Sequence, residues 1–368
     1  MNEQTVHDVI IIGGGQSGLA TAYHLRRNAL DVILLDDQSS PGGAWQHGWE
    51  SLRLFSPADA SSLPGWLMPR GLDTYPSRQE VIDYLTNYEK RYGFTIHRPV
   101  HVYAVKLEDT LFLLMTNQGE YRCRALVCST GSWSHPYLPA YAGREDFSGK
   151  QIHSATYTSP DEFAGKRVLV VGGGNSGAQI VAEVSKVANT TWVTQQEPSF
   201  LPDEVDGRYL FQAATQRFHA GDPRPRANLA DIVMVDSVKE ARSRDALQAV
   251  RPFTALNQDG VIWPDGSQES VDAIIWCTGF RPALQFLDEL DLRTPDGRVE
   301  VEGTRSVKQP GLWLVGYGSW TGFASATLIG VNRSAVKRLR KSSAFYKESS
   351  RPFFRCRIGS FNNVHRGP

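Results

Sequence analysis

Short continuous runs of apolar residues alternate along the chain with segments of helical spacing, which is typical of buried parallel strands joined by helices. The first run is Val9 to Ile12, and it ends at three consecutive glycines. A helical pattern follows from Ser17 to about Asn28, and a second apolar run covers Val32 to Leu35. This order predicts a strand–helix–strand unit and an α/β fold.

The same unit occurs a second time, in the middle of the chain. An apolar run from Arg167 to Val171 again ends at glycines, and it is followed by a helical pattern to about Val187 and a strand from Thr191 to Thr194. One unit of this kind fits many dehydrogenases, whereas two units in one chain favour two nucleotide cofactors that exchange electrons. We therefore predict two Rossmann-like dinucleotide-binding domains.

Further elements are expected around these two units. A helix is predicted to about Tyr92, with Ser77 as its N-cap. Residues 316–330 are expected to turn into a helix, whereas residues 198–260 are rich in Arg, Asp and Pro and are expected to be irregular. Apolar runs predict additional strands at residues 100–107, 111–116, 125–129, 271–276 and 312–315.

The glycines of the first unit have the spacing Gly-x-Gly-x-x-Gly. In this pattern Gly13 permits a tight turn, Gly15 lets backbone N–H groups approach a pyrophosphate, and Gly18 lets the helix pack on the strand. The N-terminus of the helix then favours the phosphate charge. Asp36 ends the second strand, where an acid accepts a hydrogen bond from a ribose hydroxyl. The sequence therefore predicts a dinucleotide site here.

The second unit has the same glycine spacing but ends differently. No acid follows its second strand, where the chain has Gln195, so an obstacle to the 2′-phosphate of NADP is absent. No Arg stands there to bind this phosphate either, and Arg208 and Arg217 are the nearest candidates. The predicted binding residues of this turn are Gly172, Gly174, Asn175, Ser176 and Gly177.

Other short motifs are expected to border the two sites. Gly42 and Gly43 allow close approach of the backbone to a ligand, and Trp45 follows them directly. Trp45 is expected to form an apolar wall together with Trp49, Trp66 and Trp320, although a packed aromatic loop is the alternative. The remaining candidates lie after strands or at the start of the last helix, and they are Thr130, Gly131, Thr278, Gly279, Ser325 and Ala326.

Composition and charge exclude several classes of protein. The 368 residues contain 39 Lys and Arg and 39 Asp and Glu, so charge gives no argument for nucleic acid. No apolar run approaches the roughly 20 residues of a membrane helix. The four cysteines show no CxxC and no metal spacing, which argues against a dithiol reductase and a metal site and favours the cytoplasm. Residues 333–368 hold ten Lys and Arg and one acid, and are expected to form a helix over 334–341 and a solvated tail, or a tail that binds an acidic surface.

One motif between the two glycine turns carries a family resemblance. The sequence FSGKQIHSATY fits the pattern F-x-G-x-x-x-H-x-x-x-Y/F through Phe147, Gly149, His153 and Tyr157. On this motif, residues 6–332 resemble the flavin-containing monooxygenases of the two-dinucleotide-domain class, whereas a final Trp would point to Baeyer–Villiger monooxygenases. Matching segments are Gly42, Gly43 and Trp45, and Thr278, Gly279, Phe280 and Pro282.

The resemblance implies that the first turn binds FAD, that the second binds NADPH or NADH, and that the NAD(P)-binding domain is inserted into the FAD-binding domain. His153 and its motif would belong to the linker. The implied domain limits are 1–157 with 278–345 for FAD, 158–277 for NAD(P), and 346–368 for a basic, disordered tail.

The implied reaction is an NAD(P)H-driven monooxygenation. FAD takes a hydride, molecular oxygen forms a C4a-(hydro)peroxyflavin, and one oxygen atom passes to a small-molecule soft nucleophile, namely sulfur, nitrogen or trivalent arsenic. Residues 45–69 are most similar to small bacterial members from arsenic- and metal-resistance operons. The sequence leaves a homodimer open.

Two departures from the family pattern keep alternatives open. Many relatives carry an Asn that contacts the flavin where this chain has Ser56, which joins Trp45 as a candidate catalytic residue. Relatives also place an Arg where this chain has Gln195, so NADH is a candidate reductant. The alternatives are an NAD(P)H oxidase or flavin reductase that releases hydrogen peroxide, and a non-catalytic nucleotide-binding protein.

Overall fold

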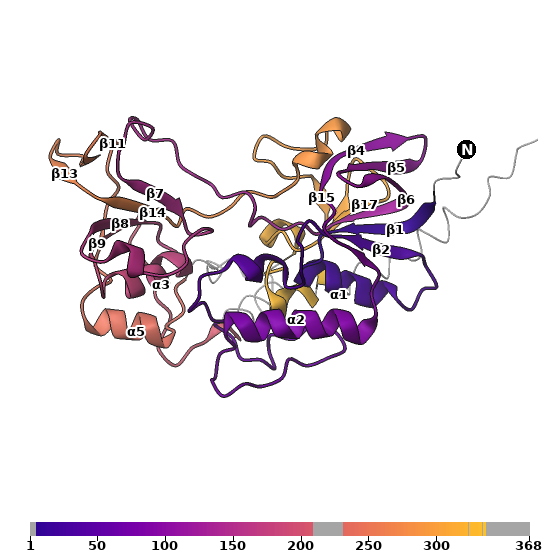
Figure 1. Ribbon diagram of the computed structural model, residues 1–368, viewed down its shortest axis with the longest axis horizontal. Helices are drawn as coiled ribbons and strands as arrows, with labels where there is room; N and C mark the ends of the chain where they lie inside the picture. The colour runs from indigo at the N-terminus through magenta and orange to yellow at the C-terminus, as the bar shows by residue number, and fades with distance from the viewer. Residues whose placement is uncertain (1–4, 209–230, 323, 333, 336–368) are drawn as a thin grey trace, which may run out of the picture.

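Two sheets organise the chain, one in each of two lobes (Figure 1). The computed structural model describes residues 5–208, 231–322, 324–332 and 334–335. The predicted candidate Arg217, most of the predicted helix over 334–341 and the tail 346–368 lie outside the described residues. None of the described helices is long and apolar enough to cross a bilayer.

The first sheet has the order β15-β16-β17-β6-β1-β2-β3, and β4 and β5 extend it from β6 as an antiparallel pair. Its central strand β1 pairs in parallel with β2 and β6, and β17 pairs in parallel with β6. The bounds are β1 Val6–Ile12, β2 Val32–Leu35, β3 Ile96–His97, β4 Val102–Glu108, β5 Leu111–Thr116, β6 Gly119–Cys128, β15 Val301–Glu302, β16 Arg305–Ser306 and β17 Leu312–Leu314.

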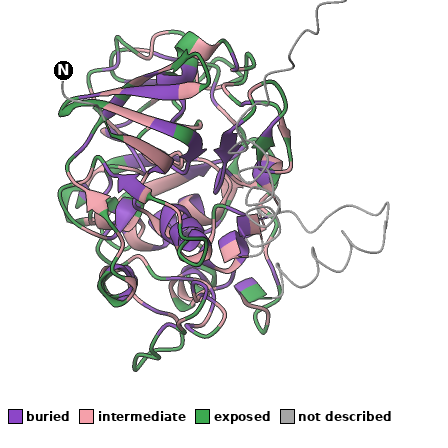
Figure 2. Cartoon of the chain, turned by 90° about the vertical axis from the view of Figure 1, so that its right-hand side faces the viewer, coloured by how far each residue is buried: buried purple, intermediate pink, exposed green. Residues whose placement is uncertain are grey.

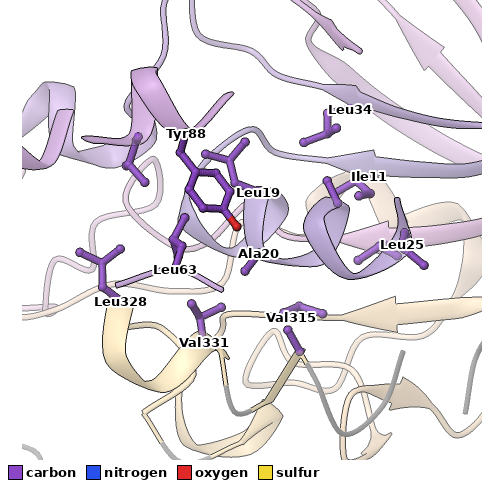
Figure 3. Close-up of a cluster of buried hydrophobic side chains, with 14 of the residues drawn as sticks. Ile11, Leu19, Ala20, Leu25, Leu34, Leu63, Tyr88, Val315, Leu328 and Val331 are labelled. Carbon is purple, nitrogen blue, oxygen red and sulfur yellow. The ribbon is translucent and has the colours of Figure 1, made fainter. Parts of the chain in front are cut away.

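Both faces of the first sheet are buried, which explains why its strands are continuous apolar runs. Along β1, Val9 and Ile11 face the helices α1 (Gln16–Leu25) and α2 (Arg78–Tyr92), where Figure 3 shows Ile11 beside Leu19 and Leu34. The alternate residues of β1 pack instead toward β4, β5 and the 3-10 helix η3 (Gln285–Leu290). Figure 2 shows buried residues on strands and helices in the interior of the molecule.

The second sheet has the order β10-β9-β8-β14-β7, and all its pairings are parallel. Helices α3 (Asn175–Val184) and α5 (Asp236–Ser243) pack with one face, and a small antiparallel sheet, β11-β12-β13, lies toward the other. The bounds are β7 Lys150–His153, β8 Arg167–Val171, β9 Asn189–Val193, β10 Ala249–Val250, β11 Ala255–Leu256, β12 Gly260–Ile262, β13 Gln268–Ser270 and β14 Ala273–Trp276.

The second lobe begins earlier in the chain than the predicted limit at residue 158. Strand β7 pairs with β14, and Phe147 belongs to the core on one face of the second sheet. These pairings place part of the FSGKQIHSATY motif inside the second sheet, where the sequence interpretation had a linker between the domains. The two sheets, one within the sequence span of the other, bear out the predicted pair of Rossmann-like domains.

Most predicted elements are present, with shifted ends. Strands β2, β5 and β8 have the predicted bounds, and α2 follows an N-cap at Ser77 whose capping box includes Glu80. Helix α1 ends at Leu25 rather than near Asn28, and β6 begins at Gly119 rather than Ala125 because it pairs with β5 across a hairpin. Near the end of the described chain, residues 328–332 are helical.

A buried ion network ties the first sheet to α2. Arg98 donates to Asp36 Oδ2 from Nε at 2.6 Å and to both carboxylate oxygens of Glu89 at 2.7 Å. The side chains of Arg98, Asp36 and Glu89 are 13%, 4% and 10% exposed. One guanidinium thus neutralises two acids that are largely out of water, so its removal leaves buried charge unpaired.

We expect Arg98→Met to lower the free energy of unfolding by about 3 kcal/mol or more, because two buried carboxylates lose their only cationic partner in this network. The measurement is chemical denaturation of the purified protein. Arg70→Met is the matched control, since Arg70 pairs with Asp59 at the surface and should cost less than about 1 kcal/mol. Equal losses in the two variants would contradict the stabilising role of the network.

Candidate functional site

A cavity of about 650 Å³ lies at the carboxyl ends of the parallel strands of the first sheet. Asp36 follows β2 directly, Ser129 follows β6, and Gly316 comes just after β17, and all three line the cavity. In open parallel α/β sheets this edge is where ligands bind. The sheet therefore brings together residues that are far apart in the sequence.

The glycine turn beside the cavity has the geometry that its spacing predicts. Gly13 has φ +106°, and a Cβ on Gly18 would lie 2.0 Å from the Gly13 carbonyl oxygen, so the helix packs on the turn only through glycine. A Cβ on Gly15 would find its nearest neighbour, Gly43 Cα, at 3.9 Å. A side chain at Gly15 would therefore not clash with the protein, and Gly15 itself lines the cavity.

The N-terminus of α1 is available to an anion. Gly15 is the N-cap of this helix and provides no side-chain acceptor for the first N–H groups. Such groups bind phosphate oxygens through hydrogen bonds and the helix dipole. Gly42 and Gly43, with φ +116° and +53°, also line the cavity, and a Cβ on Gly43 would lie 2.8 Å from Gly15 Cα, so this segment packs directly against the turn. This set of donors and this space fit the pyrophosphate of a dinucleotide.

Asp36 borders the same cavity and is held by Arg98, as described above. A Cβ on Gly14 would lie 2.5 Å from Asp36 Oδ2, so the carboxylate packs directly against the glycine turn. The position agrees with an acid that accepts a ribose hydroxyl near the pyrophosphate. Arg98 was not among the residues that the sequence singled out, because it lies 62 positions from Asp36.

Gln16 is a second cavity residue that the sequence analysis missed. Its Nε2 donates to the Ala326 carbonyl at 2.7 Å, and its Oε1 accepts from Trp45 Nε1 at 3.1 Å. One amide thus joins the glycine turn, the Gly-Gly-x-Trp segment and the turn that precedes helical residues 328–332. All three residues line the cavity, which places the predicted candidates Trp45 and Ala326 beside the first glycine turn.

Thr130 and Gly131 also line the cavity, on the side of β6. The Thr130 hydroxyl donates to the Ala283 carbonyl at 2.7 Å and is hydrogen-bonded to the Tyr317 hydroxyl at 2.7 Å. Burial raises the pKa of Tyr317 well above its usual value, so this hydroxyl stays protonated. These contacts fix the loop after β6 in one position.

Several predicted residues lie away from this cavity lining. Ser56 is 4% exposed, and its hydroxyl is hydrogen-bonded to Ser61 at 2.8 Å. Ser325 is buried and hydrogen-bonds the Gly318 backbone. Of the predicted tryptophans only Trp45 lines the cavity, whereas Trp49 packs on Tyr157, Trp66 on Tyr84 and Trp320 on Tyr317.

The second glycine turn repeats the geometry of the first. Gly172 has φ +138°, and a Cβ on Gly177 would lie 2.0 Å from the Gly172 carbonyl oxygen. A Cβ on Gly174 would meet no atom within 4 Å. The predicted candidate Asn175 begins α3, and its side-chain amide donates to the Asp231 carbonyl and accepts from the Val233 N–H. It therefore positions neighbouring backbone.

The remaining predicted residues of the second unit lie at its edge or between the lobes. Ser176 is half-buried on the first turn of α3, and Gln195 is exposed after β9. Arg208 pairs with Asp206 and borders a different cavity, near Asp59 and Trp66. Thr278 and Gly279 lie in the segment that returns from the second lobe to the first.

Two segments that connect the lobes run side by side. The Tyr137 N–H donates to the Gly279 carbonyl at 2.9 Å, and the Arg281 N–H donates to the His135 carbonyl at 2.8 Å. Phe280 stacks on Trp133, which lines the cavity, with centroids 5.1 Å apart. We call residues 133–137 and 278–282 the paired connection. It links the cavity wall to the second lobe.

His153 ends β7 next to this connection. Its ring meets the Phe280 ring edge-on at 4.9 Å, and its Nδ1 accepts from the Ala155 N–H at 3.1 Å. Burial lowers the pKa of His153, so the imidazole is neutral at pH 7. The ring therefore acts as a packed, uncharged group between the end of β7 and the paired connection.

Comparisons with known proteins agree with this geometry. Residues 10–316 match a family model described as pyridine nucleotide-disulphide oxidoreductase. A solved flavin-containing monooxygenase from Stenotrophomonas maltophilia is 50% identical with a TM-score of 0.87, over 93% of this chain and 99% of that chain.

Curated relatives are more distant. An uncharacterized CzcO-like oxidoreductase from Geobacillus kaustophilus is 30% identical over 89% of this chain and 95% of its own length. An indole-3-pyruvate monooxygenase from Oryza sativa, YUCCA1, is 27% identical over 95% and 94%.

We expect Gly15→Ala to leave folding intact and to remove a bound dinucleotide. The added Cβ would not clash with the protein, but it would stand where the pyrophosphate of the ligand must approach the backbone. When both proteins are free of FAD, the variant's unfolding free energy should stay within about 1 kcal/mol of the wild type. Gly18→Ala, with its clash at the Gly13 carbonyl, should instead lose roughly 1–3 kcal/mol or more. The measurements are thermal unfolding and FAD released per polypeptide, and normal FAD content in Gly15→Ala would remove Gly15 from the site.

Proposed function

The chain belongs to the flavin-containing monooxygenase family, whose members bind FAD and NADP, and on that premise we propose that FAD binds in the cavity at the first glycine turn and NADPH or NADH at the second. The protein is accordingly an NAD(P)H- and oxygen-dependent oxidoreductase. The observation that carries the proposal is the cavity of about 650 Å³ lined by Gly15, Gly43 and Asp36 at the N-terminus of α1.

Each part of the first cavity has a role in holding FAD. The N–H groups that follow Gly15 bind the pyrophosphate, and the Asp36 carboxylate accepts a ribose hydroxyl. Trp45, fixed by its hydrogen bond to Gln16, forms an apolar wall that keeps water from the reacting centre. The bound flavin supplies the redox chemistry, which includes hydride acceptance and oxygen activation. The protein supplies position and exclusion of solvent.

We propose a soft nucleophile as the substrate, with sulfur or nitrogen as the reacting atom. Such an atom offers its own lone pair, so the protein needs no general base to activate it. Trivalent arsenic is the third candidate, and it rests on the resemblance of residues 45–69 alone. Among the described residues no three His, Cys, Asp or Glu side chains gather into a metal-binding group.

A coupled turnover assay tests this function. With methyl phenyl sulfide as the probe, one sulfide, one O2, one NAD(P)H and one proton should give one sulfoxide, one NAD(P)+ and one water. Stoichiometric hydrogen peroxide with every sulfide and amine tried would establish the oxidase alternative instead. A purified protein that binds no FAD and oxidises neither NADPH nor NADH would favour the nucleotide-binding alternative.

We expect Trp45→Ala to raise the hydrogen peroxide formed per NAD(P)H, because loss of the indole opens the cavity to water. Trp45→Phe keeps an aromatic wall and should stay closer to the wild type. Ser56→Ala should leave this ratio unchanged, since the Ser56 hydroxyl is already paired with Ser61. The measurement is peroxide against NAD(P)H consumed, and uncoupling in Ser56→Ala alone would assign the role to Ser56.

A further inference from the structure

One cationic side chain directly follows a strand at the carboxyl edge of the second sheet. The residues after β7, β8, β9, β10 and β14 are Ser154, Gly172, Thr194, Arg251 and Cys277. Arg251 follows β10, which pairs in parallel with β9 through Ala249 and Val250. Its backbone is therefore placed beside the end of β9, at the edge where a dinucleotide binds.

The guanidinium of Arg251 is held at that edge. Its Nη1 donates to the Thr194 carbonyl at 3.1 Å and to the Thr194 hydroxyl at 3.0 Å. Its Nη2 donates to the Glu197 carboxylate. The side chain is 46% exposed, so it stays open to a ligand while three acceptor atoms fix its direction.

Thr194 connects this guanidinium to the second glycine turn. A Cβ on Gly173 would lie 3.3 Å from Thr194 Cγ2, so the threonine methyl packs against the turn. In a Rossmann unit the 2′ position of the adenosine ribose is read just beyond the second strand, by an acid for NAD or by an Arg for NADP. Here the second strand is β9, and the residue that would read it, Gln195, is neutral.

We propose that Arg251 binds the 2′-phosphate of NADPH from the neighbouring strand, and that Glu197 opposes this binding. The proposal rests on the proposed function, in which the second turn binds the nicotinamide dinucleotide. Arg251 supplies the charge-assisted hydrogen bonds that position 195 lacks. The Glu197 side chain is 78% exposed, and it competes with the phosphate for the same guanidinium. NADH has no phosphate at this position, so the pair does not affect its binding.

If this pair sets the preference between NADPH and NADH, substitutions at Arg251 and at Glu197 should change the affinity for NADPH in opposite directions. Arg251→Met removes the group that binds the 2′-phosphate, so it should lower the affinity for NADPH without changing the affinity for NADH. Glu197→Gln removes the charge that competes for the guanidinium, so it should raise the affinity for NADPH without changing the affinity for NADH. A merely structural role for Arg251, through its bonds to Thr194, would weaken both dinucleotides equally.

The test measures binding by calorimetry on the purified holoenzyme, with 2′,5′-ADP and 5′-AMP as probes that differ only in the 2′-phosphate. We expect Arg251→Met to lose about tenfold or more in affinity for 2′,5′-ADP and little for 5′-AMP. Glu197→Gln should gain affinity for 2′,5′-ADP alone. Arg167→Met is the matched control, because Arg167 forms a similar exposed pair with Asp272 at the start of β8.

Steady-state kinetics give the second readout, as KM for NADPH and for NADH in the same variants. The proposal is overturned if the wild type binds both probes equally, or if Arg251→Met weakens 5′-AMP as much as 2′,5′-ADP. A protein that binds the probes as expected but oxidises no NAD(P)H would retain this inference while the proposed monooxygenase function fails. If both variants oxidise NAD(P)H normally and keep the wild-type preference between NADPH and NADH, the proposed function would stand and the inference about Arg251 would fail.

Discussion

The contact between the third glycine of each turn and the carbonyl of the first is the constraint on which both lobes depend. A side chain at Gly18 or Gly177 would meet that oxygen at 2.0 Å, so either helix can begin this close to its strand only without a Cβ. The close start turns the N-terminus of the helix toward the carboxyl edge of the sheet. The same solution appears twice, in two sheets with separate cores.

This constraint also explains how much the sequence could predict. The glycine spacing and the apolar runs are local signals, and they located β1, β2, β8 and the two glycine turns before any contact was known. The capping box at Ser77 is local in the same way. The strand bound that shifted most is the start of β6, whose added length comes from pairing with β5 rather than from its own apolar pattern.

The residues that sequence reasoning missed owe their positions to pairing between distant segments. Arg98 meets Asp36 only because β3 lies beside β2, and Arg251 meets Thr194 only because β10 lies beside β9. Gln16 stood within the glycine motif itself, but its partners lie 29 and 310 positions away. Ser56 was placed by analogy with relatives, and its buried partner Ser61 gives no sign in the sequence pattern.

The paired connection has a mechanical consequence for the two lobes. The two segments are hydrogen-bonded side by side, at Tyr137 with Gly279 and at Arg281 with His135, and together they form a short two-stranded ribbon. A ribbon bends across its flat face far more easily than it shears in its own plane, because shear would break the bonds that join its edges. We therefore expect the lobes to rotate about a single hinge axis, with the stacked rings of Trp133 and Phe280 close to that axis.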